Sequence, residues 1–105
     1  MTELAAPIAR MIEATNAGDT AGFLASFSDD AYIEDWGRGF HGQTGAASWN
    51  ETDNIGRHAR FEVLGHRDEG ETQVVSIQVS GGGYNGTGDI VFTVAGGKIT
   101  RMIIG

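Results

Sequence analysis

Asp35 is the residue of this sequence whose type and position are best suited to proton transfer. It ends residues 31–35 (AYIED), where strand-like alternation puts Ala31, Ile33 and Asp35 on one face. A carboxylate at the end of an apolar stripe is costly to bury, and burial without a partner usually raises its pKa. The pattern therefore makes Asp35 a candidate general base. The alternative is that Asp35 lies just past the strand and caps the turn at Gly37.

Other reactive combinations are missing from the sequence. It contains no cysteine, which excludes disulfides, thiolate metal sites and a cysteine nucleophile. Its three histidines, His41, His58 and His66, do not have the spacing of a metal-binding pair. The glycine-rich residues 81–88 do not fit a dinucleotide- or phosphate-binding loop, because they lead from one predicted strand into another. We therefore expect neither a metal ion nor a cofactor.

The first half of the chain is predicted to be mainly helical. Apolar residues recur at helical spacing at Leu4, Ile8, Met11 and Ile12. Pro7 fits only the first turn of that helix, and residues 16–18 (NAG) are a stop signal. Asp19 can cap a second helix, which we expect to end at residues 28–30. A third, weaker helix is predicted across residues 44–54, after a turn-rich segment that begins at Gly37.

The hydrophobic period changes to two near residue 60, which indicates strands. Four are predicted, around residues 61–65, 74–79, 90–94 and 99–104. Turn signals separate them at residues 68–70, 85–86 and 96–97. Helices followed by an antiparallel meander predict one α+β domain over residues 1–105. A strongly curved sheet covered by helices encloses a cone, whose open end is a natural pocket for a small molecule.

Charge and hydropathy exclude several partners. The net charge is −7 with only seven Lys and Arg residues, which argues against nucleic acid and anionic membranes as partners. No apolar run approaches the roughly 20 residues of a membrane span, and the N-terminus lacks the features of a signal peptide. We therefore expect a cytoplasmic protein that binds neither nucleic acid nor membrane.

Three segments, residues 9–19, 29–42 and 89–99, resemble the nuclear transport factor 2-like superfamily. Within that superfamily, the chain is similar to the SnoaL-like group and to steroid Δ5-3-ketoisomerases. The resemblance implies a cystatin-like fold, in which three N-terminal helices pack on a curved antiparallel sheet that forms a cone. It also implies a homodimer that buries the outer face of the sheet, and a small hydrophobic molecule as the ligand.

The resemblance assigns roles to individual residues. Asp35 falls where the isomerases hold their general base, and Asp89 where a protonated aspartic acid donates a hydrogen bond to the substrate oxyanion. Met11 falls where they hold an oxyanion-hole tyrosine. Methionine cannot donate that hydrogen bond, and losing one such donor typically costs ~10²–10³-fold in rate. The apolar side chains expected to line the pocket are Met11, Phe27, Trp36, Phe40 and Trp49.

Three functions follow from these observations. The leading one is acid–base chemistry next to a carbonyl by Asp35 and Asp89, as in a ketosteroid isomerase-like isomerase, a dehydratase or a polyketide cyclase-like lyase. The second is a non-enzymatic module that binds a hydrophobic ligand or acts as a dimeric scaffold, which Met11 favours. The third, implied only by the resemblance, is epoxide hydrolysis, which some members of the superfamily perform with two aspartates bridged by an arginine. Arg101 has no good positional match for that role, and alternation leaves open which face Asp89 and Arg101 occupy.

Overall fold

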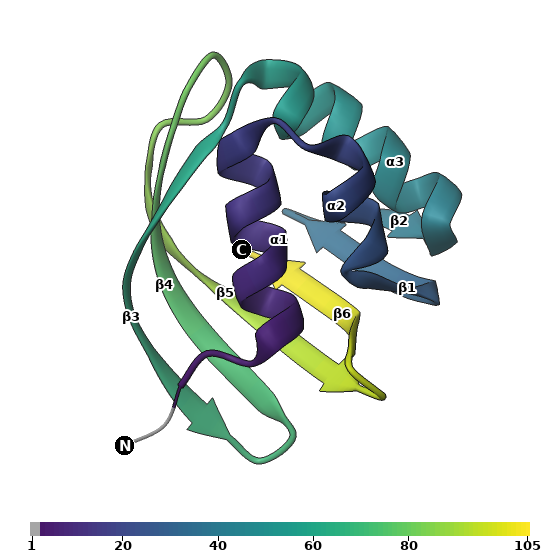
Figure 1. The fold of residues 1–105 in the computed structure, drawn as a ribbon. Coiled ribbons are helices and arrows are strands. Elements are labelled where there is room, and N and C mark those ends of the chain that lie inside the picture. The colour runs from purple at the N-terminus through teal and green to yellow at the C-terminus, as the bar shows by residue number, and fades with distance from the viewer. Residues whose placement is uncertain (1–2) are drawn as a thin grey trace.

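Three α-helices lie against one face of a curved, six-stranded sheet (Figure 1). The computed structural model describes residues 3–105. The elements, in chain order, are α1 (Ala6–Ala17), α2 (Thr20–Ala25), β1 (Phe27–Asp35), β2 (Arg38–His41), α3 (Gly42–Asp53), the 3-10 helix η1 (Ile55–Arg57), β3 (Arg60–Glu69), β4 (Thr72–Ser80), β5 (Gly86–Ala95) and β6 (Lys98–Ile104). This arrangement confirms the predicted α+β fold. No helix in the described part of the chain is long and apolar enough to cross a membrane.

The ends of the first two helices follow local signals. Pro7 lies in the first turn of α1, and Gly18 ends the helix with a left-handed φ of 70°, a conformation that glycine adopts without a Cβ penalty. Asp19 then caps α2 by accepting a hydrogen bond from the backbone N–H of Gly22 at 3.0 Å. Both boundaries were predicted from the sequence.

Gly18→Ala is expected to lower the free energy of unfolding by about 1–2 kcal/mol, the cost of a left-handed conformation for an L-residue. A Cβ added at Gly18 meets nothing within 4 Å, so the loss comes from the backbone alone. Gly88 is a matched control, because it also has open space around it but no left-handed φ. Urea denaturation should show no decrease in the free energy of unfolding for Gly88→Ala. An equal decrease in both variants would contradict this explanation.

Two predicted boundaries around β1 are wrong. The second helix ends at Ala25, and Phe27 already belongs to β1, where it pairs with Ile99 of β6. The turn-rich segment after Gly37 contains β2, which pairs antiparallel with β1. Trp36 and Gly37 form the connection, with φ values of 49° and 84°, which suits a two-residue hairpin turn. In both places, strand pairing outweighs the local preference.

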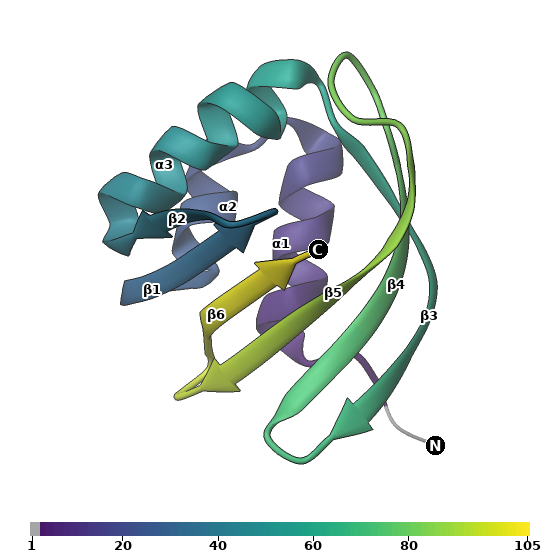
Figure 2. The same ribbon diagram turned by 180° about the vertical axis from the view of Figure 1, so that it is seen from behind.

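The sheet has the order β2-β1-β6-β5-β4-β3. Strands β3 to β6 form an antiparallel meander, as predicted, while β1 runs parallel to β6. The turn at Gly96 and Gly97 has the expected positive φ values of 60° and 76°. Register shifts interrupt three strand pairs, β1–β6, β3–β4 and β5–β6, and such bulges bend a sheet. Figure 2 shows the resulting curvature from behind.

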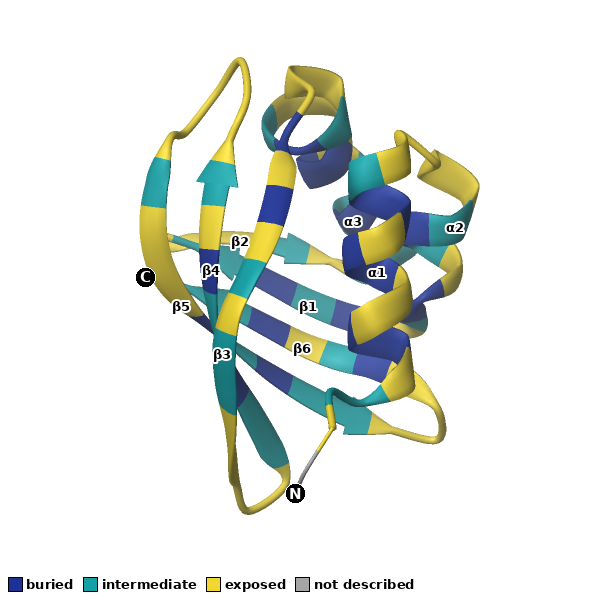
Figure 3. Cartoon of the chain, turned by 60° about the vertical axis from the view of Figure 1, so that its left-hand side comes forward, coloured by how far each residue is buried: buried dark blue, intermediate teal, exposed yellow. Residues whose placement is uncertain are grey.

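The core fills the space between the helices and the concave face of the sheet (Figure 3). At its centre the ring of Phe23 lies 4.9 Å from that of Phe27 and 6.0 Å from that of Trp49. The fully buried apolar residues around it include Ile8, Met11, Ile33, Ile77, Phe92, Ile99 and Met102. The core thus holds α1, α2 and α3 against the sheet, and it places the C-terminal part of α3 beside the end of β1.

Candidate functional site

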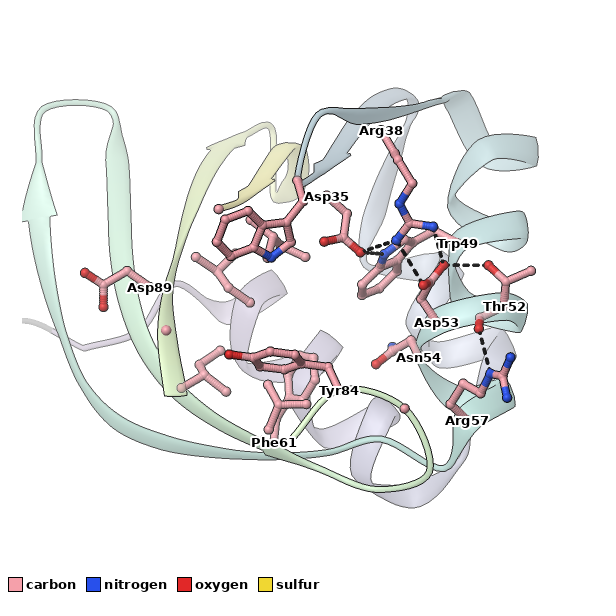
Figure 4. A pocket seen from close by; sticks show the side chains of 18 of the residues that line it. Asp35, Arg38, Trp49, Thr52, Asp53, Asn54, Arg57, Phe61, Tyr84 and Asp89 are labelled. Atoms are coloured by element: carbon pink, nitrogen blue, oxygen red, sulfur yellow. Dashed lines mark hydrogen bonds and ion pairs between the residues drawn. The ribbon is translucent and has the colours of Figure 1, made fainter. Parts of the chain in front are cut away.

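A cavity of about 860 Å³ opens between the C-terminal part of α3, the concave face of the sheet and the loop that joins β4 to β5 (Figure 4). One wall is polar and consists of Asp35, Arg38, Thr52, Asp53, Asn54 and Arg57. The facing wall is apolar and includes Phe61, Ile77, Val79, Ile90 and Ile104. Such a cavity can hold a small, mostly apolar molecule and present a few polar groups to one side of it.

Asp35 extends into this cavity from the end of β1. Alternation along the strand buries Ala31 and Ile33, and leaves the Asp35 side chain only 13% exposed. Its Oδ2 accepts hydrogen bonds from Arg38 Nη2 at 2.7 Å and from Trp49 Nε1 at 3.0 Å. No group within residues 3–105 donates a hydrogen bond to Oδ1. The carboxylate is therefore held by one oxygen, while the other can accept a proton.

Arg38 connects Asp35 to a second aspartate. Its Nη2 also donates to Asp53 Oδ1 at 2.9 Å, and its Nη1 to Asp53 Oδ2 at 3.3 Å. Thr52 Oγ1 donates to Asp53 Oδ2 at 2.6 Å. Both oxygens of Asp53 are thus occupied, in contrast to those of Asp35. Dashed lines in Figure 4 trace this Asp35–Arg38–Asp53 bridge.

The bridge shifts the pKa values of Arg38 and Asp53. Burial is the largest single influence on the pKa of Asp53 and raises it. The hydrogen bonds from Arg38 and Thr52, together with the charges of Arg38 and Arg57, outweigh burial and hold the pKa of Asp53 below its ordinary value of 3.8. The hydrogen bond to Asp53 is the main cause of the raised pKa of Arg38. Both groups are therefore charged at neutral pH.

The lowered pKa of Asp53 predicts a stability effect that depends on pH. A group with a lowered pKa in the folded state stabilises that state above its unfolded pKa, and the effect is lost as the pH falls through the folded pKa. We expect Asp53→Asn to lower the free energy of unfolding at pH 6.5 by up to about 1 kcal/mol, the usual worth of a partly exposed ion pair. The difference from wild type should narrow below pH 3.8. Urea denaturation at pH 6.5 and pH 3 in low salt measures the free energy of unfolding of both proteins. If the variant differed from wild type equally at both pH values, the lowered pKa of Asp53 would not be the cause.

The predicted apolar pocket residues separate into two groups. Trp36 and Trp49 line the cavity. Met11 and Phe27 instead belong to the buried core, and Phe40 packs against that core with the Arg38 guanidinium 5.5 Å from its ring centroid. None of these three lines the cavity. The cavity is displaced from them because α3 and the β4–β5 loop, rather than α1 and α2, form its walls.

The structure does not bring Asp89 together with Asp35. Ile90 and Phe92 of β5 are buried in the core, so alternation turns the side chain of Asp89 outward. Asp89 is exposed and accepts a hydrogen bond from Ser76 Oγ at 2.7 Å. It borders the cavity, but Figure 4 shows its carboxylate pointing away from the Asp35–Arg38–Asp53 bridge. The predicted pairing of the two aspartates therefore has no geometric support here.

Arg101 also lies away from Asp35. Its guanidinium lies 5.0 Å from the ring centroid of Tyr32, which alternates with Asp35 along β1 and so faces the other side of the sheet. The arginine between two aspartates is Arg38, which the sequence analysis did not identify. Two local signals could have found this group. Arg38 follows Asp35 across a two-residue turn, and Asp53 lies one helical turn after Trp49.

The residues that the structure describes contain no group of three or more histidine, cysteine, aspartate or glutamate side chains able to hold a metal ion. The carboxylates of Asp35 and Asp53 in the cavity wall are instead both paired with the guanidinium of Arg38. A cation in the same place would have to displace Arg38 from both carboxylates. The wall thus presents one carboxylate with an oxygen that lacks a donor within residues 3–105, Asp35, beside the positive charge of Arg38.

Solved structures with the same fold include proteins described as enzymes. A protein from Sinorhizobium meliloti described as a candidate polyketide cyclase is 26% identical with a TM-score of 0.85, and the match covers 94% of this chain and 93% of that one. The Δ5-3-ketosteroid isomerase from Mycobacterium sp. is 20% identical with a TM-score of 0.80 and coverages of 93% and 88%. The epoxide hydrolase/cyclase-like enzyme SalBIII, with a role in pyran ring formation in salinomycin, is 19% identical with a TM-score of 0.81 and coverages of 92% and 84%.

Other neighbours with this fold are a nuclear transport factor 2-like protein from Cytophaga hutchinsonii and a cystatin-fold protein from Novosphingobium aromaticivorans. The predicted fold class is thereby confirmed.

No curated protein matches the chain significantly. The sequence profile of the SnoaL-like domain matches residues 8–102, which is nearly the whole chain and includes Asp35, Arg38 and Asp53. The chain belongs to the SnoaL-like domain family.

Proposed function

We propose that this protein abstracts a proton next to a carbonyl group in a small, mostly apolar molecule, with Asp35 as the general base. The observation that carries the proposal is the state of the Asp35 carboxylate. Oδ2 is held by Arg38 and Trp49, whereas Oδ1 has no donor within residues 3–105. Asp35 borders a cavity with an apolar wall. A fixed base beside a place for an apolar substrate is what general base catalysis requires.

Arg38 has the second role in this proposal. Proton abstraction from the carbon next to a carbonyl leaves negative charge on the carbonyl oxygen, and a nearby cation stabilises it. Arg38 lines the cavity and is the cation bonded to Asp35. We assign it the role that the resemblance to the isomerases implied for Asp89 and for the tyrosine that Met11 replaces. The isomerase and cyclase descriptions of related structures support the reaction type.

Deuterium exchange tests the proposal without knowledge of the natural substrate. 2-Tetralone is a flat, apolar ketone with acidic hydrogens next to its carbonyl, and abstraction of one of them in deuterium oxide leads to incorporation of deuterium. We expect the protein to accelerate this exchange above the buffer rate with saturation at high ketone concentration, as followed by proton NMR. Saturable binding of the ketone without faster exchange would instead support the alternative of a non-enzymatic binding module.

A second reaction is favoured by one specific observation, the bridge from Asp35 through Arg38 to Asp53. Two aspartates joined by an arginine suit hydrolysis of an epoxide. Asp53, which is charged, would take a proton from water while the water oxygen attacks an epoxide carbon. The C–O bond would break, and Asp35 in its protonated form would give its proton to the leaving oxygen to yield a diol. The two reactions differ in their need for Asp53, as developed in the Discussion.

Two further expectations stay predictions. Homodimerisation would bury the outer face of the sheet, which carries the half-buried side chains of Val91 and Ile103 and the exposed side chain of Leu64. A cytoplasmic location is the other. Neither is required for the chemistry proposed for Asp35, since the residues named in that proposal all come from one copy of the chain.

A further inference from the structure

Asn54 is a buried polar residue in the wall of the cavity. It follows α3, it is buried, and it borders the same cavity as Asp35. Its Nδ2 donates to Thr15 Oγ1 at 3.1 Å and to Asn50 Oδ1 at 3.0 Å. Its Oδ1 has no hydrogen-bond donor among residues 3–105. Burying an acceptor without a donor is unfavourable, so this oxygen needs an explanation.

The neighbours of Asn54 determine which way its amide faces. Asn50 Oδ1 accepts a hydrogen bond from the backbone N–H of Ile55 at 3.4 Å, so the oxygen of Asn50 faces Asn54. The hydroxyl of Thr15 donates to Met11 Sδ at 3.6 Å and therefore offers a lone pair to Asn54. Both neighbours accept, which requires the nitrogen of Asn54 on their side. Its oxygen is then left on the side of the cavity, and Figure 4 shows the side chain pointing that way.

We propose that Asn54 Oδ1 recognises a hydroxyl or N–H group of a ligand bound in this cavity. The polar wall presents two oxygens that no donor within residues 3–105 satisfies, Asn54 Oδ1 and Asp35 Oδ1. A ligand that brings a donor satisfies an acceptor, whereas an apolar ligand of the same shape leaves it unpaired, and such sites discriminate strongly between the two. The ligand class is therefore a small apolar compound that carries at least one donor. The inference shares its cavity with the proposed function but requires no reaction.

Binding of matched probes to the wild-type protein is the primary test. 2-Naphthol and 2-fluoronaphthalene have the same ring and nearly the same size, but only the naphthol can donate a hydrogen bond. We expect 2-naphthol to bind about 5- to 100-fold more tightly in fluorescence titrations, which corresponds to satisfying one buried acceptor. The side-chain amide signals of Asn54 in a nitrogen–proton NMR spectrum should shift further with 2-naphthol than with 2-fluoronaphthalene, because both rings act on them but only the naphthol adds a hydrogen bond. Equal affinities, or no saturable binding of either probe, would overturn the proposal.

Three variants assign the preference to a residue. Asn54→Ala should reduce the ratio of the two affinities to about one to two, since the acceptor is gone. Asn50→Ala is the matched control, because it breaks the buried hydrogen bond between the two amides. Thr15 Oγ1 still accepts from Asn54 Nδ2 and keeps Asn54 Oδ1 on the side of the cavity, so the preference should persist. Asp35→Asn should also keep the preference for 2-naphthol, although it removes deuterium exchange into 2-tetralone. This variant therefore distinguishes failure of this inference from failure of the proposed reaction. A preference that survives in Asn54→Ala, or disappears in Asp35→Asn, would reject the assignment to Asn54.

Discussion

Asp35→Asn is expected to reduce the rate of deuterium exchange into 2-tetralone by about 10²- to 10⁴-fold, the usual contribution of a general base. The amide nearly preserves the shape of the carboxylate, and its oxygen can still accept the hydrogen bonds from Arg38 and Trp49. An amide does not accept a proton at neutral pH, however. Proton NMR measures the rate, and circular dichroism checks that the variant is folded. A folded variant with wild-type exchange would contradict the role of Asp35.

Asp53→Asn is the matched control for this experiment. It removes the same charge from the same partner, Arg38, but both oxygens of Asp53 are already occupied by Arg38 and Thr52. We therefore expect exchange in this variant to fall less than about tenfold, because it keeps the general base. With an epoxide such as styrene oxide as the probe, the expectation changes. A hydrolysis that needs both aspartates would be lost in either variant, so the pair of variants separates the two candidate reactions.

Trp49→Ala is expected to lower the free energy of unfolding by about 3–5 kcal/mol, the range for deleting a large buried aromatic side chain. Trp49 is 3% exposed, and its ring lies 6.0 Å from that of Phe23. The deletion would open a space between α3 and the sheet. Urea denaturation measures the loss. Tyr84→Ala is the control, since Tyr84 is 59% exposed and its removal should change stability by less than about 0.5 kcal/mol.

Trp49→Phe separates packing from hydrogen bonding at the same position. Phenylalanine keeps one aromatic ring in the core but cannot donate to Asp35 Oδ2, which now receives the indole N–H at 3.0 Å. We expect the free energy of unfolding to fall by about 1.5–3 kcal/mol, the range for a hydrogen bond to a charged group, and therefore by less than in Trp49→Ala. If Trp49→Phe lost as much as Trp49→Ala, the hydrogen bond rather than the packing would account for the role of Trp49.

Local chemistry was enough to predict much of the fold. The end of α1 at Gly18 and the turn at Gly96 and Gly97 depend on left-handed backbone, which few residues other than glycine adopt easily. Asp35 was placed correctly on the face of Ala31 and Ile33, because side chains alternate along any strand. These features involve residues next to one another in the chain, so the neighbouring residue types carry the necessary information.

Local preference was misleading where a distant strand supplied the partner. The helical pattern through Phe27 yielded to pairing with β6, more than seventy residues further along the chain. The hairpin between β1 and β2 places Trp36 at a φ of 49°, which is uncommon for a residue with a bulky side chain. Pairing of Asp35 with Arg38 across that turn maintains the conformation. The residue types around Trp36 do not predict its left-handed backbone.

For this protein, the amino-acid sequence was sufficient to identify the α+β fold class and to single out Asp35, because both follow from local periodicity and from segments that resemble a known family. The partners of Asp35 depended on the folded molecule. Alternation cannot choose a face for Asp89 in a strand that is fairly apolar on both sides. Arg38 reaches the cavity across the hairpin between β1 and β2. Asp53 and Asn54 reach it because α3 docks beside the end of β1, and that docking is determined by core packing between distant segments.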